Sequence, residues 1–166
     1  DRVGWRSFIR ASIESEDHYL IQRLWATSQR LGSPKSASEW VWFARAAGQV
    51  QDPGLLSETL RGFCGSGLEL RASGWHVFFE AAIASGSGSV DDVWRAWSAR
   101  RGPLSNRTWH ALIREAQAQR RGDLLEAIWE ACEGAAHTLS PHIWVGLTFA
   151  ARECNHADVM RRVWAA

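Results

Sequence analysis

Lysine is almost absent from this chain: Lys35 stands alone beside 18 arginines. The three cysteines form no CxxC pair, so neither a zinc site nor a disulfide framework is predicted. No apolar run approaches the ~20 residues that a membrane-spanning helix needs. Neither sign of charge predominates, because the net charge is only +1. That balance is a weak argument for a polyanionic partner, although arginine is the better basic residue for phosphate contacts and base stacking.

Catalytic motifs are missing as well. The segment Ser85–Ser89 alternates Ser and Gly and is expected to form a flexible hairpin turn. It lacks the Gly-Lys-Ser/Thr end of a phosphate loop, and no strand is expected before it. No Ser, Cys or Thr has an evident base partner in a motif. Cys154 and His156, with His137 and His142 before them, lack the paired spacing of a zinc site. We therefore predict a protein that is not an enzyme and that takes no metal, no cofactor and no small-molecule substrate.

Tryptophan, in contrast, is abundant and periodic. One series recurs every 34 or 35 residues: Trp5, Trp40, Trp75, Trp109 and Trp144. A second series follows the first by 19 or 20 residues: Trp25, Leu60, Trp94, Trp129 and Trp164. Three residues past the first series the side chain is large and apolar (Phe8, Phe43, Phe78, Leu112, Leu147), and seven past it the side chain is small (Ser12, Ala47, Ala82, Ala116, Ala151). Large and small residues at fixed places on one helix face suit close packing of neighbouring helices.

This period predicts an all-α fold, a right-handed α-solenoid of about five helical hairpins. A single hairpin cannot bury its own apolar face, so hairpins stack and share a core. The units are expected at 1–35, 36–70, 71–104, 105–139 and 140–166, as one array. The chain begins at Asp1 rather than Met, and neither end has an obviously polar capping helix, so we expect a piece of a longer array.

The phrase Thr108-Trp109-His110-Ala111-Leu112-Ile113 and the 35-residue period resemble pentatricopeptide repeats, whose units have the form "TYNALI". The resemblance is degenerate in each unit but extends over all five. Two features depart from that family: Trp replaces the usual Tyr, and the turn between the helices comes about two residues later. Tetratricopeptide and half-tetratricopeptide repeats have similar periods and stay open, and Gly122–Ala131 is compatible with the latter.

The resemblance implies that single-stranded RNA lies along the surface of the first helices, with one base read per repeat. The reading positions would be the residue after each helix-opening Trp, namely Arg6, Val41, His76, His110 and Val145, and the residue that closes each repeat, namely Ser36, Arg71, Ser105 and Ser140. Arg, Val and His do not match the family's usual first readers, whereas the Ser closures fit. Arg6, Arg71, His76 and His110 are therefore candidates for phosphate contact or base stacking.

Two functions are weighed. The first is an RNA-associated helical-repeat protein in the mitochondrion or another organelle, contacting rRNA or another organellar RNA and neighbouring proteins as a structural part of a ribonucleoprotein such as the mitochondrial ribosome. The second is a tetratricopeptide-type protein–protein interaction scaffold. Trp42 lies two residues after Trp40 and points away from the packing face, so it is expected to be the most exposed Trp. Together with Val41 and Val145 it is a candidate partner contact.

Overall fold

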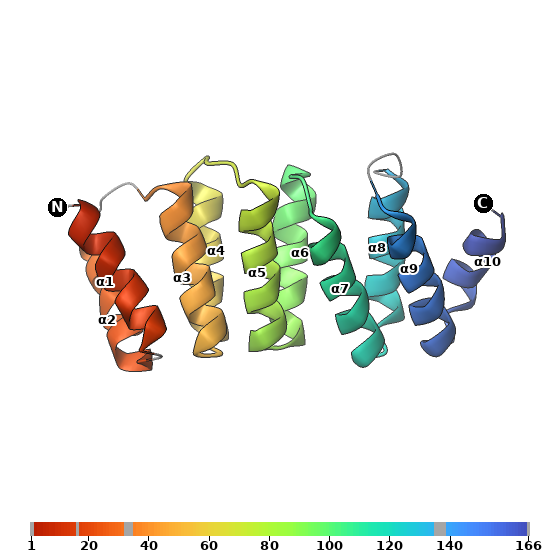
Figure 1. Ribbon diagram of the computed structural model, residues 1–166, viewed down its shortest axis with the longest axis horizontal. Coiled ribbons are helices and arrows are strands. Elements are labelled where there is room, and N and C mark those ends of the chain that lie inside the picture. The colour runs from red at the N-terminus through yellow and green to blue at the C-terminus, as the bar shows by residue number, and fades with distance from the viewer. Residues whose placement is uncertain (1, 16, 32–34, 135–138, 166) are drawn as a thin grey trace. The chain divides into compact units, whose positions relative to one another are not determined.

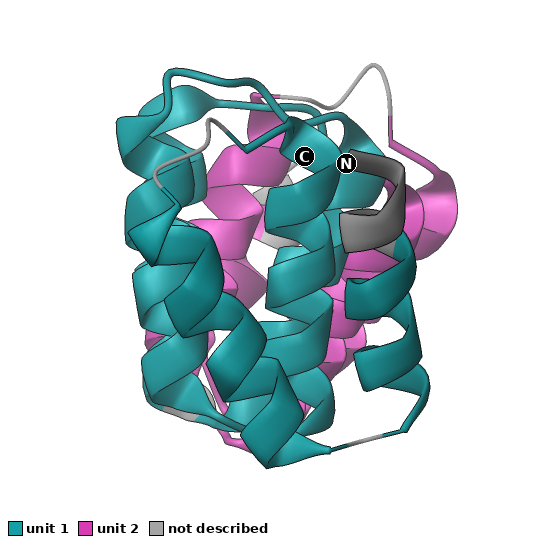
Figure 2. Ribbon diagram, turned by 90° about the vertical axis from the view of Figure 1, so that its left-hand side faces the viewer, with its two compact units in different colours: residues 1–103 teal, residues 104–166 magenta. Residues whose placement is uncertain are grey.

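The computed structural model describes residues 2–15, 17–31, 35–134 and 139–165, with the side chains of 2–6, 87 and 163–165 outside that description. Helices connected by short turns make up these residues, and no strand occurs among them, so the predicted all-α class is confirmed. The chain divides into two compact units, residues 1–103 and 104–166 (Figure 2). This boundary coincides, within one residue, with the end of the third predicted repeat.

Unit 1 contains three helical hairpins (Figure 1). Their helices are α1 (Arg2–Glu14) with α2 (His18–Arg30), α3 (Ala37–Gln49) with α4 (Pro53–Gly65), and α5 (Ala72–Ser85) with α6 (Ser87–Arg100). The first helices α1, α3 and α5 pack side by side in one layer, and α4 packs beside α6 in a second layer.

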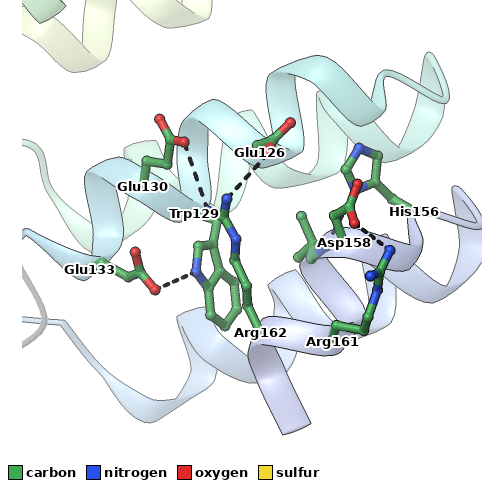
Figure 3. A network of polar contacts seen from close by, with 9 residues as sticks. Glu126, Trp129, Glu130, Glu133, His156, Asp158, Arg161 and Arg162 are labelled. Carbon is green, nitrogen blue, oxygen red and sulfur yellow. Dashed lines mark hydrogen bonds and ion pairs between the residues drawn. The ribbon is translucent and has the colours of Figure 1, made fainter. Parts of the chain in front are cut away.

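Unit 2 contains two hairpins, α7 (Asn106–Ala118) with α8 (Gly122–Glu133) and α9 (Pro141–Glu153) with α10 (Ala157–Ala165). Helix α9 packs against α7 and α8, and α10 packs against α9 and α8. Polar contacts help to join α10 to α8 (Figure 3): the Arg162 guanidinium lies 3.4 Å from a Glu126 carboxylate oxygen and 3.8 Å from one of Glu130. Trp129 on α8 donates its indole N–H to Glu133 at 2.7 Å.

The turn between the two helices of a hairpin has a backbone conformation that recurs along the chain. Gln51, Arg120 and Asn155 occupy equivalent places after α3, α7 and α9, and each has φ between 51° and 53°. The residue after each of them donates its N–H to the carbonyl of the alanine that lies seven residues after the Trp of the first series. These acceptors are Ala47, Ala116 and Ala151, at 2.9 Å, 2.8 Å and 2.9 Å. Such a left-handed residue with a bond back across the last helical turn ends a helix sharply. The 35-residue period therefore appears in backbone conformation as well as in side chains.

The third hairpin has a tighter turn, at the place where the sequence is one residue shorter. Gly86, with φ 108°, is the single residue between α5 and α6, and this conformation suits glycine. The sequence predicted a flexible turn over all of Ser85–Ser89, which is wrong for residues 87–89, because they form the first turn of α6. Starting the helix there places Val90 fully in the core.

The predicted packing columns form the core. Trp40, Trp75, Trp109, Trp25, Leu60 and Trp129 are buried, whereas Trp94 and Trp144 are half-buried; the side chains of Trp5 and Trp164 lie outside the described set. In the column of large residues, Phe43 and Phe78 are 1% and 0% exposed, but Phe8 is 58% exposed. The cause lies in the stacking within unit 1. Phe43 packs on Trp25 of the preceding hairpin and Phe78 on Phe63, whereas the described part of unit 1 places no preceding hairpin against α1.

None of the helices in the described part of the chain is both long enough and apolar enough to cross a membrane.

Candidate interaction surface on the first helices of unit 1

A groove runs over the face of the first-helix layer of unit 1. It consists of two neighbouring pockets of about 410 Å³ each, which share Val41, Trp42 and Arg45 of α3. One pocket extends to α1, where Arg10, Ile13 and Glu14 line it, and the other to the start of α5. We call this feature the first-helix groove.

Helix geometry explains why these side chains come together. Val41 and Arg45 are four residues apart on α3, so they lie on one face, and Trp42 projects beside them. The opposite face of α3 carries Trp40, Phe43 and Ala47, which are buried. The core thus fixes the orientation of α3 and leaves the groove residues on the outside.

Close helix packing brings the residues of the groove together. A β-carbon built on Gly48 of α3 would stand 2.7 Å from the Cα of Ala81 on α5, and one on Gly74 would stand 3.3 Å from a methyl carbon of Val41. The absence of side chains at these glycines allows α3 and α5 to approach closely. Their approach brings the start of α5, with Arg71, alongside Trp42 and Val41.

The charges of the groove are mixed. Arg10 forms an exposed ion pair with Glu14 at 2.8 Å, which occupies both side chains. Within the described part of the chain, Arg45 and Arg71 form no ion pair, and both are exposed. Glu69 is the other acid in the lining of the two pockets. The groove therefore offers two guanidinium groups that form no ion pair among the described residues, together with a half-buried indole.

Three of the predicted repeat-closing serines are the N-cap residues of first helices. Ser36 caps α3 in a capping box with Glu39, and Ser105 caps α7 by accepting the N–H of Thr108 at 3.2 Å. Ser140 occupies the N-cap position of α9 without a side-chain cap bond. The hydroxyls of Ser36 and Ser105 are thus already engaged in capping the N-termini of α3 and α7. Arg71 is the N-cap residue of α5, but its side chain forms no cap hydrogen bond.

The other candidates lie apart from this groove. His76 on α5 is paired with Glu80, with Nε2 and Oε1 3.0 Å apart, and only 12% of its side chain is exposed. In unit 2, His110 on α7 is half-buried and Val145 on α9 is exposed, close in sequence to the exposed Phe149. The side chain of Arg6 lies outside the described residues. The structure therefore brings together Val41, Trp42 and Arg71 of the candidates.

Trp42 is half-buried, as Trp94 and Trp144 also are, so it is not set apart from the other tryptophans by exposure. It is set apart by its surroundings, because it lines both pockets of the groove. Arg10 and Arg45 were not predicted from the sequence. Both lie five residues after a Trp of the first series. That position comes four residues after the predicted base-reading position, so the two positions share a helix face.

In the described residues, no three or more His, Cys, Asp or Glu side chains gather where they could hold a metal ion. Burial raises the pKa of Cys132 to about 12, and that thiol is fully buried in unit 2, so it is not available as a nucleophile. When the chain is compared with protein-family models, with curated proteins and with solved structures, nothing matches it.

Proposed function

We propose that this chain is a non-catalytic, RNA-associated helical-repeat protein, and that the first-helix groove of unit 1 holds a segment of single-stranded RNA. The observation that carries the proposal is the grouping of Trp42, Arg45 and Arg71. An indole offers a flat surface on which any base can stack, and guanidinium groups contact phosphates. The groove runs across α1, α3 and α5, as an extended strand would.

The proposal includes the finer architecture. The helical hairpins are the units of a right-handed α-solenoid that resembles pentatricopeptide repeats, and each unit of the period presents its first helix to the RNA. The backbone turn that recurs at Gln51, Arg120 and Asn155 supports a true structural repeat. Because two of the repeat-closing serines are occupied as helix caps, the RNA contact proposed here relies on stacking and phosphates rather than on base-by-base reading.

The place of action follows from the same resemblance. With a net charge of +1 and mixed charges in the groove, the affinity for free RNA is expected to be modest. A protein of this kind fits a structural position in an organellar ribonucleoprotein, such as the mitochondrial ribosome, where neighbouring proteins supply further contacts.

A second function, a scaffold that binds a peptide or helix of another protein, is favoured by one observation. Val41, Val77 and Leu70 give the groove an apolar floor beside Trp42. Apolar anchors of this kind suit peptide recognition in a helical groove. The two functions make different demands on Arg45 and Arg71, because only RNA needs both as phosphate contacts.

The experiment compares fluorescently labelled single-stranded RNA binding by the native protein and by the double variant Arg45→Gln/Arg71→Gln over a range of salt. Each lost phosphate contact should lower the slope of log K against log[salt] by about 0.7. The control is Arg23→Gln/Arg30→Gln, which removes the same charge from exposed positions on α2. Equal losses in the two double variants, or no loss in either, would reject the groove as the RNA site.

A further inference from the structure

A separate pocket lies in the other helix layer of unit 1, between α4 and α6. It has a volume of about 360 Å³ and is lined by Arg61 of α4 and by Arg95 and Arg100 of α6. Asp92 is the one acid among its lining residues. Three guanidinium groups and one carboxylate leave two positive charges uncompensated. This α4/α6 pocket shares no lining residue with the first-helix groove.

Arg100 is held in place by the protein itself. Its Nη2 donates to the carbonyl oxygen of Cys64 at 2.8 Å, and its guanidinium carbon lies 5.1 Å from the centroid of the Phe63 ring. These contacts fix the plane of the guanidinium and join the last turn of α4 to the last turn of α6. One N–H of the five is used by Cys64, so others stay available to an oxyanion. A fixed guanidinium loses little freedom when it binds.

The neighbouring charges leave Arg61 without a counter-ion. Arg95 is paired with Asp92, Nη1 to Oδ1, at 3.0 Å. Glu58, three residues before Arg61, accepts the indole N–H of Trp25 at 2.6 Å and is thereby directed to α2. In the described part of the chain Arg61 forms no ion pair, and its side chain is exposed.

We propose that the α4/α6 pocket binds a phosphate group, with Arg61 and Arg100 as its two ligands. Planar guanidinium groups on two sides match the several acceptor oxygens of a phosphate, and such charge-assisted hydrogen bonds are among the strong ones. Asp92 remains paired with Arg95, so neither residue is a ligand of the proposed site. This site is independent of RNA binding in the first-helix groove and adds a contact on the other helix layer of unit 1.

The test is a titration of the protein with inorganic phosphate, followed through the arginine Nε–H signals in ¹H–¹⁵N NMR spectra, at constant ionic strength. The signals of Arg61 and Arg100 should move together with one dissociation constant. In Arg61→Gln the affinity reported by Arg100 should fall on the order of tenfold. Arg61 is exposed, so this variant should fold normally, whereas Arg100→Gln would also disturb the contact with Phe63. Arg30→Gln, an equal charge loss on α2, should leave the affinity unchanged.

A parallel titration with a dinucleotide that carries one phosphodiester identifies the source of the phosphate. Binding of the dinucleotide at least as tight as that of inorganic phosphate assigns the pocket to a nucleic-acid backbone. Binding of inorganic phosphate alone assigns it to free phosphate or a phosphomonoester. If the Arg61 and Arg100 signals stay still, or if they move no more than those of Arg23 and Arg30, the proposal is overturned. Loss of RNA binding in the first-helix groove would not affect this outcome.

Discussion

The ring of Trp25 meets the ring of Phe43 edge-on, with centroids 4.9 Å apart and planes at 76°. Trp25 belongs to the first hairpin and Phe43 to the second. The same kind of contact joins the second hairpin to the third, where the centroids of Phe63 and Trp75 are 5.7 Å apart at 85°. In unit 2, Trp129 meets Trp144 at 5.1 Å and 74°. Aromatic pairs therefore recur at the junctions between hairpins within each unit.

This relationship predicts a measurable coupling. A double-mutant cycle with Trp25→Leu and Phe43→Leu is measured by denaturant unfolding. The double variant should lose less free energy of unfolding than the sum of the two single losses, by about 0.5–1.5 kcal/mol. The reason is that either change alone removes the edge-on contact. Purely additive losses would mean that the two rings are neighbours without a specific interaction.

The close approach of α3 and α5 predicts a steric effect at Gly48. In Gly48→Ala the new methyl group would lie 2.7 Å from the Cα of Ala81, so the helices must separate, at a cost of about 1–3 kcal/mol in the free energy of unfolding. The matched control is Gly65→Ala at the end of α4, where nothing lies within 4 Å of the added β-carbon. That control should be neutral or slightly stabilising. If thermal unfolding finds both variants alike, the packing of α3 on α5 is not as described.

Burial distinguishes the core tryptophans from the tryptophan of the groove. Trp75→Ala should lower the free energy of unfolding by about 3–5 kcal/mol, because Trp75 is 1% exposed and packs on Phe63 and Phe78. Trp42→Ala should cost about 1 kcal/mol or less, because its side chain is half-buried in an open pocket. Both residues lie in unit 1, so the same denaturation curve compares them. Equal losses would contradict the division between core and groove.

Cys132 should resist alkylation until unit 2 opens. Its pKa is raised from 9.0 to about 12 by burial, so at pH 8 it is a protonated thiol with no exposed surface. Iodoacetamide should modify the half-buried Cys64 and Cys154 before Cys132, as mass spectrometry of the peptides would reveal. Rapid modification of Cys132 in native buffer would show that α8 is not packed as described.

The same pKa shift has a consequence for stability at high pH. The folded chain keeps the Cys132 proton up to about pH 12, whereas the unfolded chain loses it near pH 9.0. Unfolding therefore becomes more favourable as the pH rises between these values, and this thiol has no effect below pH 9.0. Cys132→Ala should flatten the pH dependence of unfolding in that window. An unchanged profile would assign the alkaline loss of stability to other groups.

The hairpins and most of the core could be predicted from the sequence, because the two tryptophan series and the series of small residues share one period. The exposure of Phe8 was not predicted, because its column predicts a buried side chain and the sequence alone does not show which hairpins pack against α1. The beginning of α6 was also missed, because Ser and Gly are typical of turns but tolerate the first turn of a helix.

The candidate site was predicted in part. Val41 and Trp42 were identified from their helix face and Arg71 from its place at a repeat junction. Arg45 was missed because one arginine among 18 carries no signal until its neighbours in space are known. The arginines of the α4/α6 pocket were missed for the same reason, because Arg61 and Arg100 are 39 positions apart in the sequence.

The most direct measurement is sedimentation of the native protein from cell extract, with and without ribonuclease treatment. An RNA-associated structural protein should sediment rapidly as part of a large particle, and it should shift to slow sedimentation when ribonuclease degrades the RNA. Arg45→Gln/Arg71→Gln should weaken that association relative to Arg23→Gln/Arg30→Gln. Slow sedimentation from the start, or a complex that is indifferent to ribonuclease, would contradict the RNA proposal and favour the protein scaffold.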